Sequence, residues 1–330
     1  MTHTTTHPRR LGRSDINVSA LGLGCWAIGG AFTLDGRADN YGPVDDDESV
    51  RAIRRAVDMG VTFFDTADAY GTGHSETVLG RALRDVRDDV VIATKFGYTL
   101  DPAARALTGT DTTGAYVRRA LEASLRRLGI DHVDLLQLHV GDLPEERIDD
   151  VFGALEDLRQ EGHLRAYGWS TEDSHGLDVA ASRWPLATVQ HTLNVLTDQP
   201  GLLDIGAAHD LATICNMPLA MGLLSGRFDA ASRLAADDVR GSGHAWVRYF
   251  EDGRPRPEML ASLAAIRDIL RSGGRTLAQG ALAWIWARSE RTIPIPGFRD
   301  ARQVEENAGA LAFGPLTPDQ VREVDALLDR

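Results

Sequence analysis

Short apolar runs alternate with amphipathic stretches along most of the chain. The runs that lead to Asp65, Lys95 and His139 are rich in Val, Ile, Phe and Leu, which is typical of buried strands. The stretches between them repeat apolar residues at helical spacing and stop at glycines such as Gly60 and Gly129, a common feature of helix ends. The pattern therefore predicts strands and helices in strict alternation.

The number of these units predicts the fold class. About eight strand–helix units follow one another, and no change of composition marks a linker. Alternation of this kind implies a parallel sheet, and eight repeats imply a closed (β/α)8 barrel. We therefore expect an α/β protein with a single (β/α)8 TIM barrel domain over residues 1–330. An N-terminal hairpin within residues 9–23 and an extra C-terminal helix over residues 318–328 complete the prediction, and residues 1–8 are expected to form a disordered polar tail.

Two kinds of segment stand out between the predicted elements. Residues 45–48 supply consecutive carboxylates at the expected start of a helix, where they favour the positive end of its dipole. In contrast, residues 28–43, the segment that follows Lys95 and residues 228–257 lack a clear period and are expected to be loops. A loop as long as residues 228–257 is usually functional or mobile.

Composition and charge narrow the possible partners. The chain is 43% hydrophobic and 25% charged, as in globular proteins, and its net charge of −13 argues against nucleic acid and against anionic membranes. The apolar run over residues 277–287 is too short to cross a bilayer, and the N-terminus lacks the apolar core of a signal peptide. Cys25 and Cys215 lie far apart and fit no metal or redox motif, so we expect a reduced, cytoplasmic protein.

Polar side chains recur where the predicted strands end. Active sites of such barrels lie at the C-terminal ends of the strands. The residues at these positions are Asp65, Lys95, His139, Ser170, Gln190 and Asn216, and Tyr70 follows one strand in a loop. Each alone has a plain structural explanation, such as capping a turn or filling the core. Four compatible groups at three successive strand ends, namely Asp65, Tyr70, Lys95 and His139, are harder to attribute to chance.

These four groups suit proton transfer to a carbonyl oxygen. The unperturbed pKa of tyrosine is near 10, and a lysine ammonium at ~4 Å attracts a tyrosinate by roughly 4 kcal/mol at an effective dielectric of ~20. We therefore expect Lys95 to lower the pKa of Tyr70 and Asp65 to hold Lys95 charged. A neutral His139 would donate a hydrogen bond to the carbonyl. None of these side chains supplies hydride, so a cofactor is implied.

Three other motifs fit less well. Residues 22–27 match a dinucleotide-binding glycine pattern, but no helix is predicted after them, so we interpret them as a glycine-rich loop over a site. Residues 168–172 approach the hydrolase elbow, but Glu172 occupies the last glycine position. His74, His139 and Asp65 could be grouped as metal ligands, although no metalloprotease motif is present, and no bound metal is expected.

The chain resembles the aldo-keto reductase superfamily. The resemblance rests on residues 63–71 (FFDTADAYG), 93–97 (ATKFG), 134–139 (DLLQLH) and 294–299 (PIPGFR), and it extends over about residues 10–330. It implies a (β/α)8 barrel that binds NADPH, rather than NADH, without a Rossmann domain. It also implies that Asp65, Tyr70, Lys95 and His139 are the catalytic residues, with Tyr70 as the general acid.

The resemblance also implies a cofactor site. Ser170 and Gln190 would contact the carboxamide, and Arg299 would bind the adenosine 2′-phosphate, which favours NADP(H) over NAD(H). The glycine-rich segment after Asn216 would hold the pyrophosphate. The complete set of expected cofactor-binding residues is Gly24, Cys25, Trp26, Ser170, Gln190, Asn216, Pro218, Leu219, Gly222, Leu224, Ser225, Gly226, Arg227, Pro296, Gly297, Phe298, Arg299, Gln303, Glu306 and Asn307.

The sequence does not decide between several substrates and classes of function. Trp26 and Trp169 are candidates to line the substrate pocket. The main hypothesis is an NADP(H)-dependent oxidoreductase that acts on an aldehyde, a ketone, a sugar or a natural-product carbonyl. The alternative is a nucleotide-sensing regulatory subunit with little turnover, because potassium-channel beta subunits resemble the same family. A metal-dependent barrel hydrolase is a third, weaker hypothesis. No oligomeric state is predicted.

Overall fold

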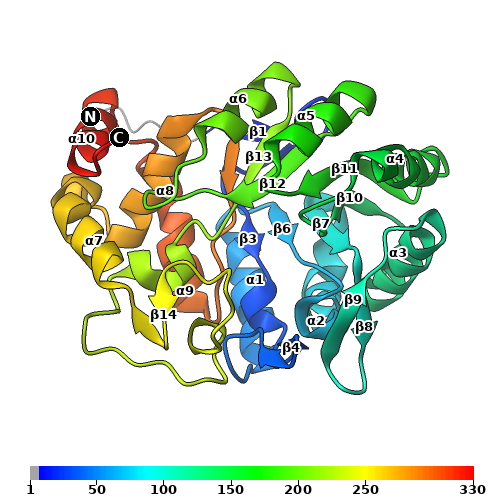
Figure 1. Cartoon of the computed structure of the whole chain (residues 1–330), viewed down its shortest axis with the longest axis horizontal. Helices are drawn as coiled ribbons and strands as arrows, with labels where there is room; N and C mark the ends of the chain where they lie inside the picture. Colours follow the sequence, from blue (N-terminus) through cyan, green and yellow to red (C-terminus); the bar gives the residue numbers. More distant parts are fainter. Residues whose placement is uncertain (1–6) are drawn as a thin grey trace.

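A barrel of parallel strands with helices around it forms the centre of the molecule (Figure 1). The computed structural model describes residues 7–330. Within that range eight strands form one sheet, in the order β16-β13-β12-β11-β10-β7-β6-β3, and all their pairings are parallel. The strands are β3 (Leu23–Gly24), β6 (Phe63–Asp65), β7 (Val91–Phe96), β10 (Val133–Leu138), β11 (Leu164–Ser170), β12 (Thr188–Thr192), β13 (Ala212–Asn216) and β16 (Thr292–Pro294).

The first and last strands of this sheet meet and close the barrel. The amide of Gly22 donates to the carbonyl of Pro294 at 3.0 Å, the amide of Gly24 donates to that of Pro296 at 3.1 Å, and Gly24 forms a parallel bridge with Gly297. A side chain at Gly24 would place its Cβ 2.8 Å from the Ile295 carbonyl oxygen. Glycine therefore allows the approach that completes the predicted (β/α)8 fold.

Helices cover the outside of the barrel (Figure 1). They are α1 (Asp46–Asp58), α2 (His74–Leu83), α3 (Gly114–Leu128), α4 (Glu145–Gln160), α5 (Ser174–Arg183), α6 (Pro200–Ala208), α7 (Pro257–Leu270), α8 (Leu277–Arg288), α9 (Ala301–Gly309) and α10 (Pro318–Leu327). The extra C-terminal helix is thus confirmed as α10. No helix within residues 7–330 combines the length and the apolar character needed to cross a bilayer.

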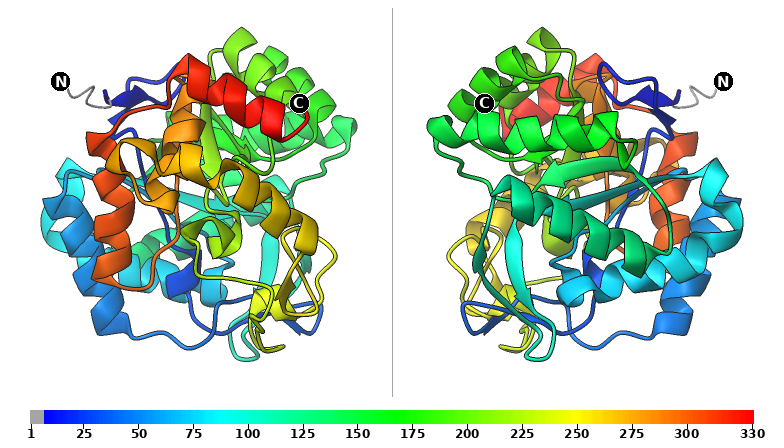
Figure 2. Two further views of the ribbon diagram at one scale, coloured as in Figure 1. Left: turned by 90° about the vertical axis from the view of Figure 1, so that its left-hand side faces the viewer. Right: turned by 90° about the vertical axis from the view of Figure 1, so that its right-hand side faces the viewer.

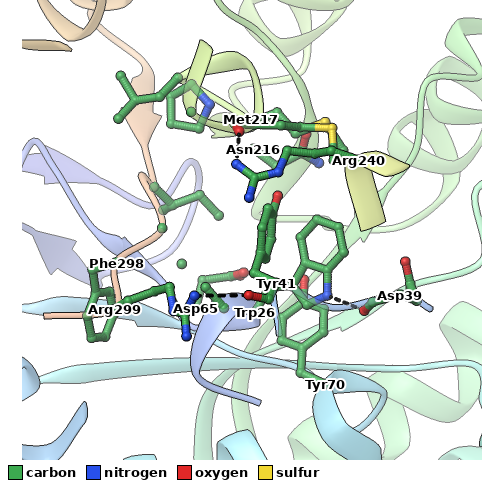
Figure 3. A pocket seen from close by; sticks show the side chains of 18 of the residues that line it. Trp26, Asp39, Tyr41, Asp65, Tyr70, Asn216, Met217, Arg240, Phe298 and Arg299 are labelled. Carbon is green, nitrogen blue, oxygen red and sulfur yellow. Dashed lines mark hydrogen bonds between the residues drawn. The ribbon is translucent and has the colours of Figure 1, made fainter. Parts of the chain in front are cut away.

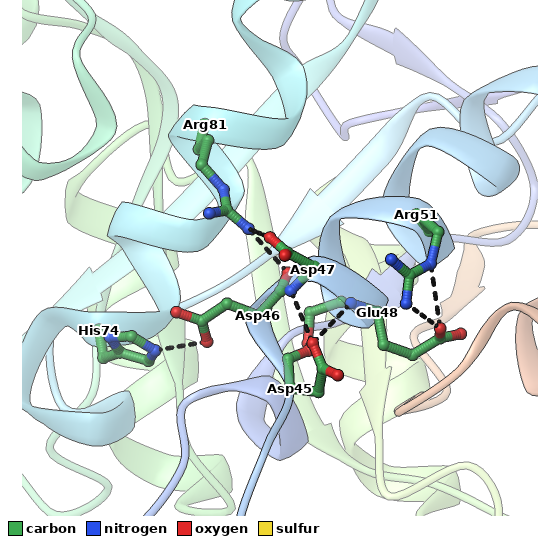
Figure 4. Close-up of polar contacts among 8 residues, drawn as sticks. Asp45, Asp46, Asp47, Glu48, Arg51, His74 and Arg81 are labelled. Carbon is green, nitrogen blue, oxygen red and sulfur yellow. Dashed lines mark hydrogen bonds and ion pairs between the residues drawn. The ribbon is translucent and has the colours of Figure 1, made fainter.

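The expected carboxylate-rich helix start is the N-terminus of α1 (Figure 4). The Asp45 side chain caps the helix by accepting from the amides of Asp47 at 2.9 Å and Glu48 at 3.1 Å. Neighbouring acids are also paired, since His74 contacts Asp46 at 2.8 Å and Arg81 donates to Asp47 at 2.9 Å. These contacts explain the acidic cluster as helix capping and surface ion pairing.

The N-terminal hairpin closes one end of the barrel. Strands β1 (Arg9–Arg10) and β2 (Asn17–Val18) pair in antiparallel fashion, as predicted. Leu11, Ile16 and Val18 pack in one apolar cluster with inward-facing strand residues such as Phe63 and Ile293. The site must therefore open at the opposite end, where the strands terminate. Of the tail expected over residues 1–8, residues 1–6 lie outside the described part of the chain.

A small second sheet lies at the open end. Strands β4 (Thr33–Leu34), β5 (Arg37–Ala38), β8 (Tyr98–Asp101) and β9 (Ala106–Thr110) form it in the order β5-β4-β9-β8, and we call it the mouth sheet. A hairpin of β14 (Phe250–Glu251) and β15 (Arg254–Pro255) lies on the same side of the molecule (Figure 2). These segments were expected to be loops. That expectation was wrong because β4 pairs with β9, a contact between distant segments that no local sequence pattern shows.

Candidate active site

A buried ion pair forms the base of the site. Strand β6 ends at Asp65, and β7 carries Lys95 to the same end of the barrel. The Lys95 ammonium pairs with the Asp65 carboxylate and donates to the Thr66 carbonyl at 2.8 Å and the Tyr70 hydroxyl at 3.2 Å. Burial disfavours the ammonium, but the charge of Asp65 and the contacts with Asp65 and Tyr70 more than offset this and hold the pKa of Lys95 above its usual value.

Two glutamines complete the contacts of Asp65. Gln137 on β10 and Gln190 on β12 each donate a side-chain hydrogen bond to the second carboxylate oxygen, at 3.0 and 2.9 Å. Asp65 therefore receives hydrogen bonds on both oxygens although it is only 1% exposed. Gln137 was not predicted. It lies two residues before His139, and the two-residue period of a strand places both on the inner face, a signal that could have found it.

Tyr70 lies next to the Asp65–Lys95 ion pair. It follows β6 in the 3₁₀ turn η2 (Tyr70–Gly73), and the Lys95 Nζ lies 4.9 Å from the centre of its ring. Burial raises the pKa of Tyr70 to about 12, although Lys95 acts in the opposite direction. The expectation that Lys95 lowers this pKa below its usual value was therefore wrong, because the loss of hydration outweighs the attraction between the two groups.

His139 is a neutral ring beside Tyr70. The two rings meet edge to face at 5.8 Å between centroids, and Tyr98 of the mouth sheet packs on His139 in the same way at 5.3 Å. Burial and the nearby Lys95 lower the pKa of His139 to about 3, so the ring is uncharged at physiological pH. Its Nδ1 is buried without a hydrogen-bond partner within residues 7–330. The ring thus has hydrogen-bonding capacity that the described protein atoms leave unused.

A cavity of about 630 Å³ opens beside these residues (Figure 3). Most of the predicted site residues line it, namely Gly24, Trp26, Asp65, Tyr70, His139, Gln190, Asn216, Pro218, Leu219, Gly222, Ser225, Arg227, Gly297, Phe298, Arg299, Gln303, Glu306 and Asn307. Lys95 lies behind Tyr70 and is fully buried. The sequence pattern thus grouped residues that the fold brings to one place.

Some predicted site residues do not line the cavity. Trp169 is the clearest correction, because it is fully buried, its indole donates to the Val140 carbonyl at 2.8 Å, and its ring packs 5.8 Å from Phe152. Side chains alternate along β11, so Trp169 faces the surrounding helices rather than the barrel interior. The others outside the lining are Cys25, Ser170, Leu224, Gly226 and Pro296, of which Cys25 and Leu224 are fully buried in the outer core.

Residues of the mouth complete the cavity wall. Those that were not predicted include Phe32, Leu34, Asp39, Tyr98, Leu107 and Arg240. Arg240 pairs with Asp238 at 2.6 Å, donates to the Met221 carbonyl at 3.1 Å, and lies 5.0 Å from the centre of the Tyr41 ring. It therefore ties the segment at residues 228–257 to the cavity. The expectation that this segment contributes to the site rested on its length, and no motif marks Arg240.

The segment that follows β13 has an unusual backbone. Ala220, Met221 and Gly222 have φ angles of 49°, 55° and 92°, within the 3₁₀ element η4 (Ala220–Ser225). Left-handed residues other than glycine cost roughly 1 kcal/mol or more each and concentrate at functional sites. The amides of Ala220, Gly222 and Leu224 donate to carbonyls of the same turn. Turns of this kind can present their remaining amides to an anion. The segment thus fits the pyrophosphate-binding role implied by its sequence.

Arg299 reaches across the cavity to the first loop (Figure 3). Its guanidinium donates to the carbonyl of Tyr41 at 3.0 Å and to that of Pro43, and its side chain is exposed. The start of α9 beside it already holds two carboxylates. Asp300 accepts from the amide of Gln303 at 2.7 Å, and Glu48 accepts from that of Ala301 at 3.2 Å. Arg299, rather than the helix N-terminus, is therefore the group left to bind a phosphate here.

The fold and the site together describe a (β/α)8 barrel whose strand ends bring Asp65, Lys95 and His139 together beside one cavity. A family model described as "Aldo/keto reductase family" matches residues 20–329. The chain belongs to that family. Within residues 7–330, no group of three or more His, Cys, Asp or Glu side chains is arranged to hold a metal ion.

Several known proteins resemble the chain along almost its whole length. Aldo-keto reductase yakc [NADP(+)] of Schizosaccharomyces pombe is 29% identical over 96% of this chain and 90% of its own. The structure of a glycerol dehydrogenase from Gluconobacter oxydans matches with a TM-score of 0.82 and 30% identity, and covers 100% of this chain and 96% of that one. An aldo/keto reductase from Klebsiella pneumoniae, solved in complex with NADP and acetate, matches with a TM-score of 0.71 and 27% identity over 97% and 95% of the two chains.

Proposed function

We propose that the protein is an NADP(H)-dependent oxidoreductase that reduces an aldehyde or a ketone to the alcohol. One observation carries the proposal: the Asp65–Lys95 pair contacts the hydroxyl of Tyr70, and Tyr70 faces the cavity beside a neutral His139. Family membership and the NADP named for relatives support the same reaction. We also propose that residues 1–330 form a single domain, as the sequence predicts.

The cavity offers groups that suit the parts of the cofactor. Gln190 on β12 and Asn216 at the end of β13 line the cavity, where a nicotinamide carboxamide would find hydrogen-bonding partners. The left-handed segment at Ala220–Ser225 would hold the pyrophosphate, and Arg299 would bind the 2′-phosphate. When bound, NADPH supplies the hydride that no side chain of the protein can provide.

Tyr70 is the general acid in this proposal. Because its pKa is raised to about 12, it holds its proton throughout the physiological pH range. As the proton moves to the carbonyl oxygen, the Lys95 ammonium at 3.2 Å stabilises the charge that develops on the tyrosine oxygen. Asp65 keeps Lys95 charged and in position, and the neutral His139 donates a hydrogen bond to the same carbonyl.

The test begins with binding and continues with turnover. Trp26 and Trp246 line the cavity, so their fluorescence should change when NADPH is titrated into the protein. Adding an aromatic aldehyde should then cause loss of the reduced-cofactor absorbance. NADPH binding together with aldehyde-dependent oxidation supports the reductase. Binding without turnover on any carbonyl would favour the nucleotide sensor instead, and absence of NADPH binding would overturn the cofactor assignment.

A further inference from the structure

A second buried acid, Asp39, lies at the edge of the cavity. It follows β5 directly and is only 8% exposed. Its backbone is fixed, because its amide donates to the Phe32 carbonyl at 3.0 Å and its carbonyl accepts from the Trp26 indole at 3.0 Å (Figure 3). Trp26 in turn stacks on Tyr70 with 6.2 Å between ring centroids. Asp39 therefore belongs to the wall that faces the reacting end of the cavity.

The carboxylate of Asp39 has no partner. Its Oδ1 is inaccessible and makes no hydrogen bond, and neither of its oxygens pairs with a cation in the chain from residue 7 to residue 330. The nearby charged groups are already engaged, since Arg240 pairs with Asp238 and the Arg37 guanidinium donates to the Gly243 carbonyl. Buried carboxylates are normally hydrogen-bonded or paired. Burial accordingly raises the pKa of Asp39 to about 7.

The surroundings of Asp39 are mostly aromatic. Trp26 packs edge to face on Tyr41 at 4.9 Å and lies 5.9 Å from Trp246, and Tyr98 of the mouth sheet also lines the cavity. Aromatic faces pack well against rings and hydrocarbon and also attract cations. A ligand with an apolar body and one hydrogen-bond donor would therefore satisfy the wall and the carboxylate together.

We propose that Asp39 is a specificity-determining residue that accepts a hydrogen bond from a donor group, a hydroxyl or an ammonium, on a substrate whose carbonyl lies at Tyr70. The inference rests on the proposed carbonyl reduction and names its substrate class: carbonyl compounds that carry a donor group away from the carbonyl. A site built to bind a donor discriminates strongly against analogues that lack one, because the acceptor is then left unpaired. Asp39 contributes to substrate binding, whereas Tyr70, Lys95 and His139 contribute to proton transfer to the carbonyl.

The test compares three aldehydes that differ at one position. The probes are 3-methylbenzaldehyde, 3-(hydroxymethyl)benzaldehyde and 3-(dimethylaminomethyl)benzaldehyde, the last of which is a cation at neutral pH. For the wild type, kcat/KM with at least one donor-bearing probe should exceed that with the methyl probe by about tenfold or more. In Asp39→Leu this ratio should fall to near one, and the change should be in KM rather than kcat.

A second variant separates the two kinds of donor. Asp39→Asn keeps an acceptor oxygen but loses the charge, so it should retain part of the preference for the hydroxyl probe and lose the preference for the cationic probe. The matched control is Asp35→Asn, which removes the same charge from an exposed turn of the same sheet. Because asparagine tolerates the left-handed backbone of Asp35, this control should keep the wild-type ratios.

Three outcomes would overturn the inference. The first is that the kcat/KM ratio of a donor-bearing probe to the methyl probe is the same in the wild type and both Asp39 variants. The second is that the Asp39 variants lose kcat equally on all three probes. The third is that Asp35→Asn changes the kcat/KM ratios as the Asp39 variants do. If the wild type reduces none of the probes although NADPH binds, the result counts against the proposed carbonyl reduction of such aldehydes and not against Asp39. The affinities of the three corresponding benzyl alcohols, measured by tryptophan fluorescence, then decide the role of Asp39. Equal affinities for the wild type and Asp39→Leu would contradict that role as well.

Discussion

Two buried acids, Asp65 and Asp39, line the same cavity but differ in their hydrogen-bond partners. Asp65 receives hydrogen bonds from Lys95, Gln137 and Gln190, whereas the carboxylate of Asp39 receives none within the described residues. In the proposed function this difference separates chemistry from recognition. Asp65, whose partners are all internal, holds Lys95 in place, and Asp39, which has no internal partner and lines the cavity, binds the substrate.

The comparison predicts stability effects of opposite sign. Asp65→Asn removes the counter-ion of the fully buried Lys95 and should lower the free energy of unfolding by about 3–5 kcal/mol. Urea unfolding at pH 7 measures the effect. Asp47→Asn is the control, because its ion pair with Arg81 is largely exposed and should matter by less than about 1 kcal/mol. Equal stability of Asp65→Asn and the wild type would show that Asp65 does not hold Lys95 as described.

Asp39→Asn should instead stabilise the protein. The native pKa of about 7 lies some three units above that of an unfolded aspartate near 3.9, so native Asp39 binds more protons than the unfolded chain between those values. Stability therefore falls as pH rises through this window, and the charged form costs roughly 2–4 kcal/mol above pH 7.

The stabilisation by Asp39→Asn should accordingly be absent near pH 4, grow up to about pH 7 and then level off. The tyrosines around Asp39, Tyr41, Tyr70 and Tyr98, have raised pKa values and stay neutral in this range. His244 on the facing segment has a lowered pKa. Urea titrations of the two proteins at several pH values measure the difference, and a destabilised variant at pH 8 would contradict the absence of a partner for Asp39.

The preference for NADPH over NADH tests the proposed role of Arg299, which also lines the cavity. Arg299→Ala should weaken NADPH binding by about tenfold to a hundredfold and change NADH binding much less, because it removes a charge-assisted hydrogen bond to the 2′-phosphate. Glu48→Gln, beside the start of α9, should change NADPH affinity a few-fold in the opposite direction, since it removes a negative charge. Fluorescence titrations with both cofactors provide the measurement. An equal loss for NADPH and NADH in Arg299→Ala would reject the 2′-phosphate assignment.

The last comparison concerns pH and the direction of reaction. Below its pKa of about 12 Tyr70 is protonated, so its contribution to carbonyl reduction should be independent of pH from 6 to 10. Alcohol oxidation needs the tyrosinate and should accelerate about tenfold per pH unit over the same range. Initial rates in both directions measure the two profiles. An alcohol oxidation rate that levels off near pH 8 would mean that the pKa of Tyr70 is lower than burial dictates.

The sequence predicted the barrel and the base of the site for a physical reason. Strand periodicity is local, and the open end of a barrel collects whatever follows each strand, so Asp65, Lys95 and His139 could be grouped from their positions alone. The same period places Trp169 on the outer face of β11, which the prediction overlooked.

The mouth sheet could not be predicted from the sequence, because its strands pair across distant segments of the chain. Strand β4 pairs with β9, and Asp39 becomes buried only when the mouth sheet and the segment around Trp246 come together. In the sequence Asp39 resembles Asp35 four residues earlier, which is exposed. The raised pKa of Tyr70 was missed for the same reason, since burial depends on the complete fold.

The central claim is that Tyr70 delivers the proton, and Tyr70→Phe tests it most directly. Single-turnover oxidation of bound NADPH by an aldehyde should slow by about 100- to 10,000-fold, because only the proton donor is lost, while the dissociation constant for NADPH should stay close to that of the wild type. Tyr167→Phe, which removes a buried hydroxyl that contacts Glu156 outside the barrel, should react at the normal rate. A Tyr70→Phe protein that reduces the aldehyde at the wild-type rate would contradict the account.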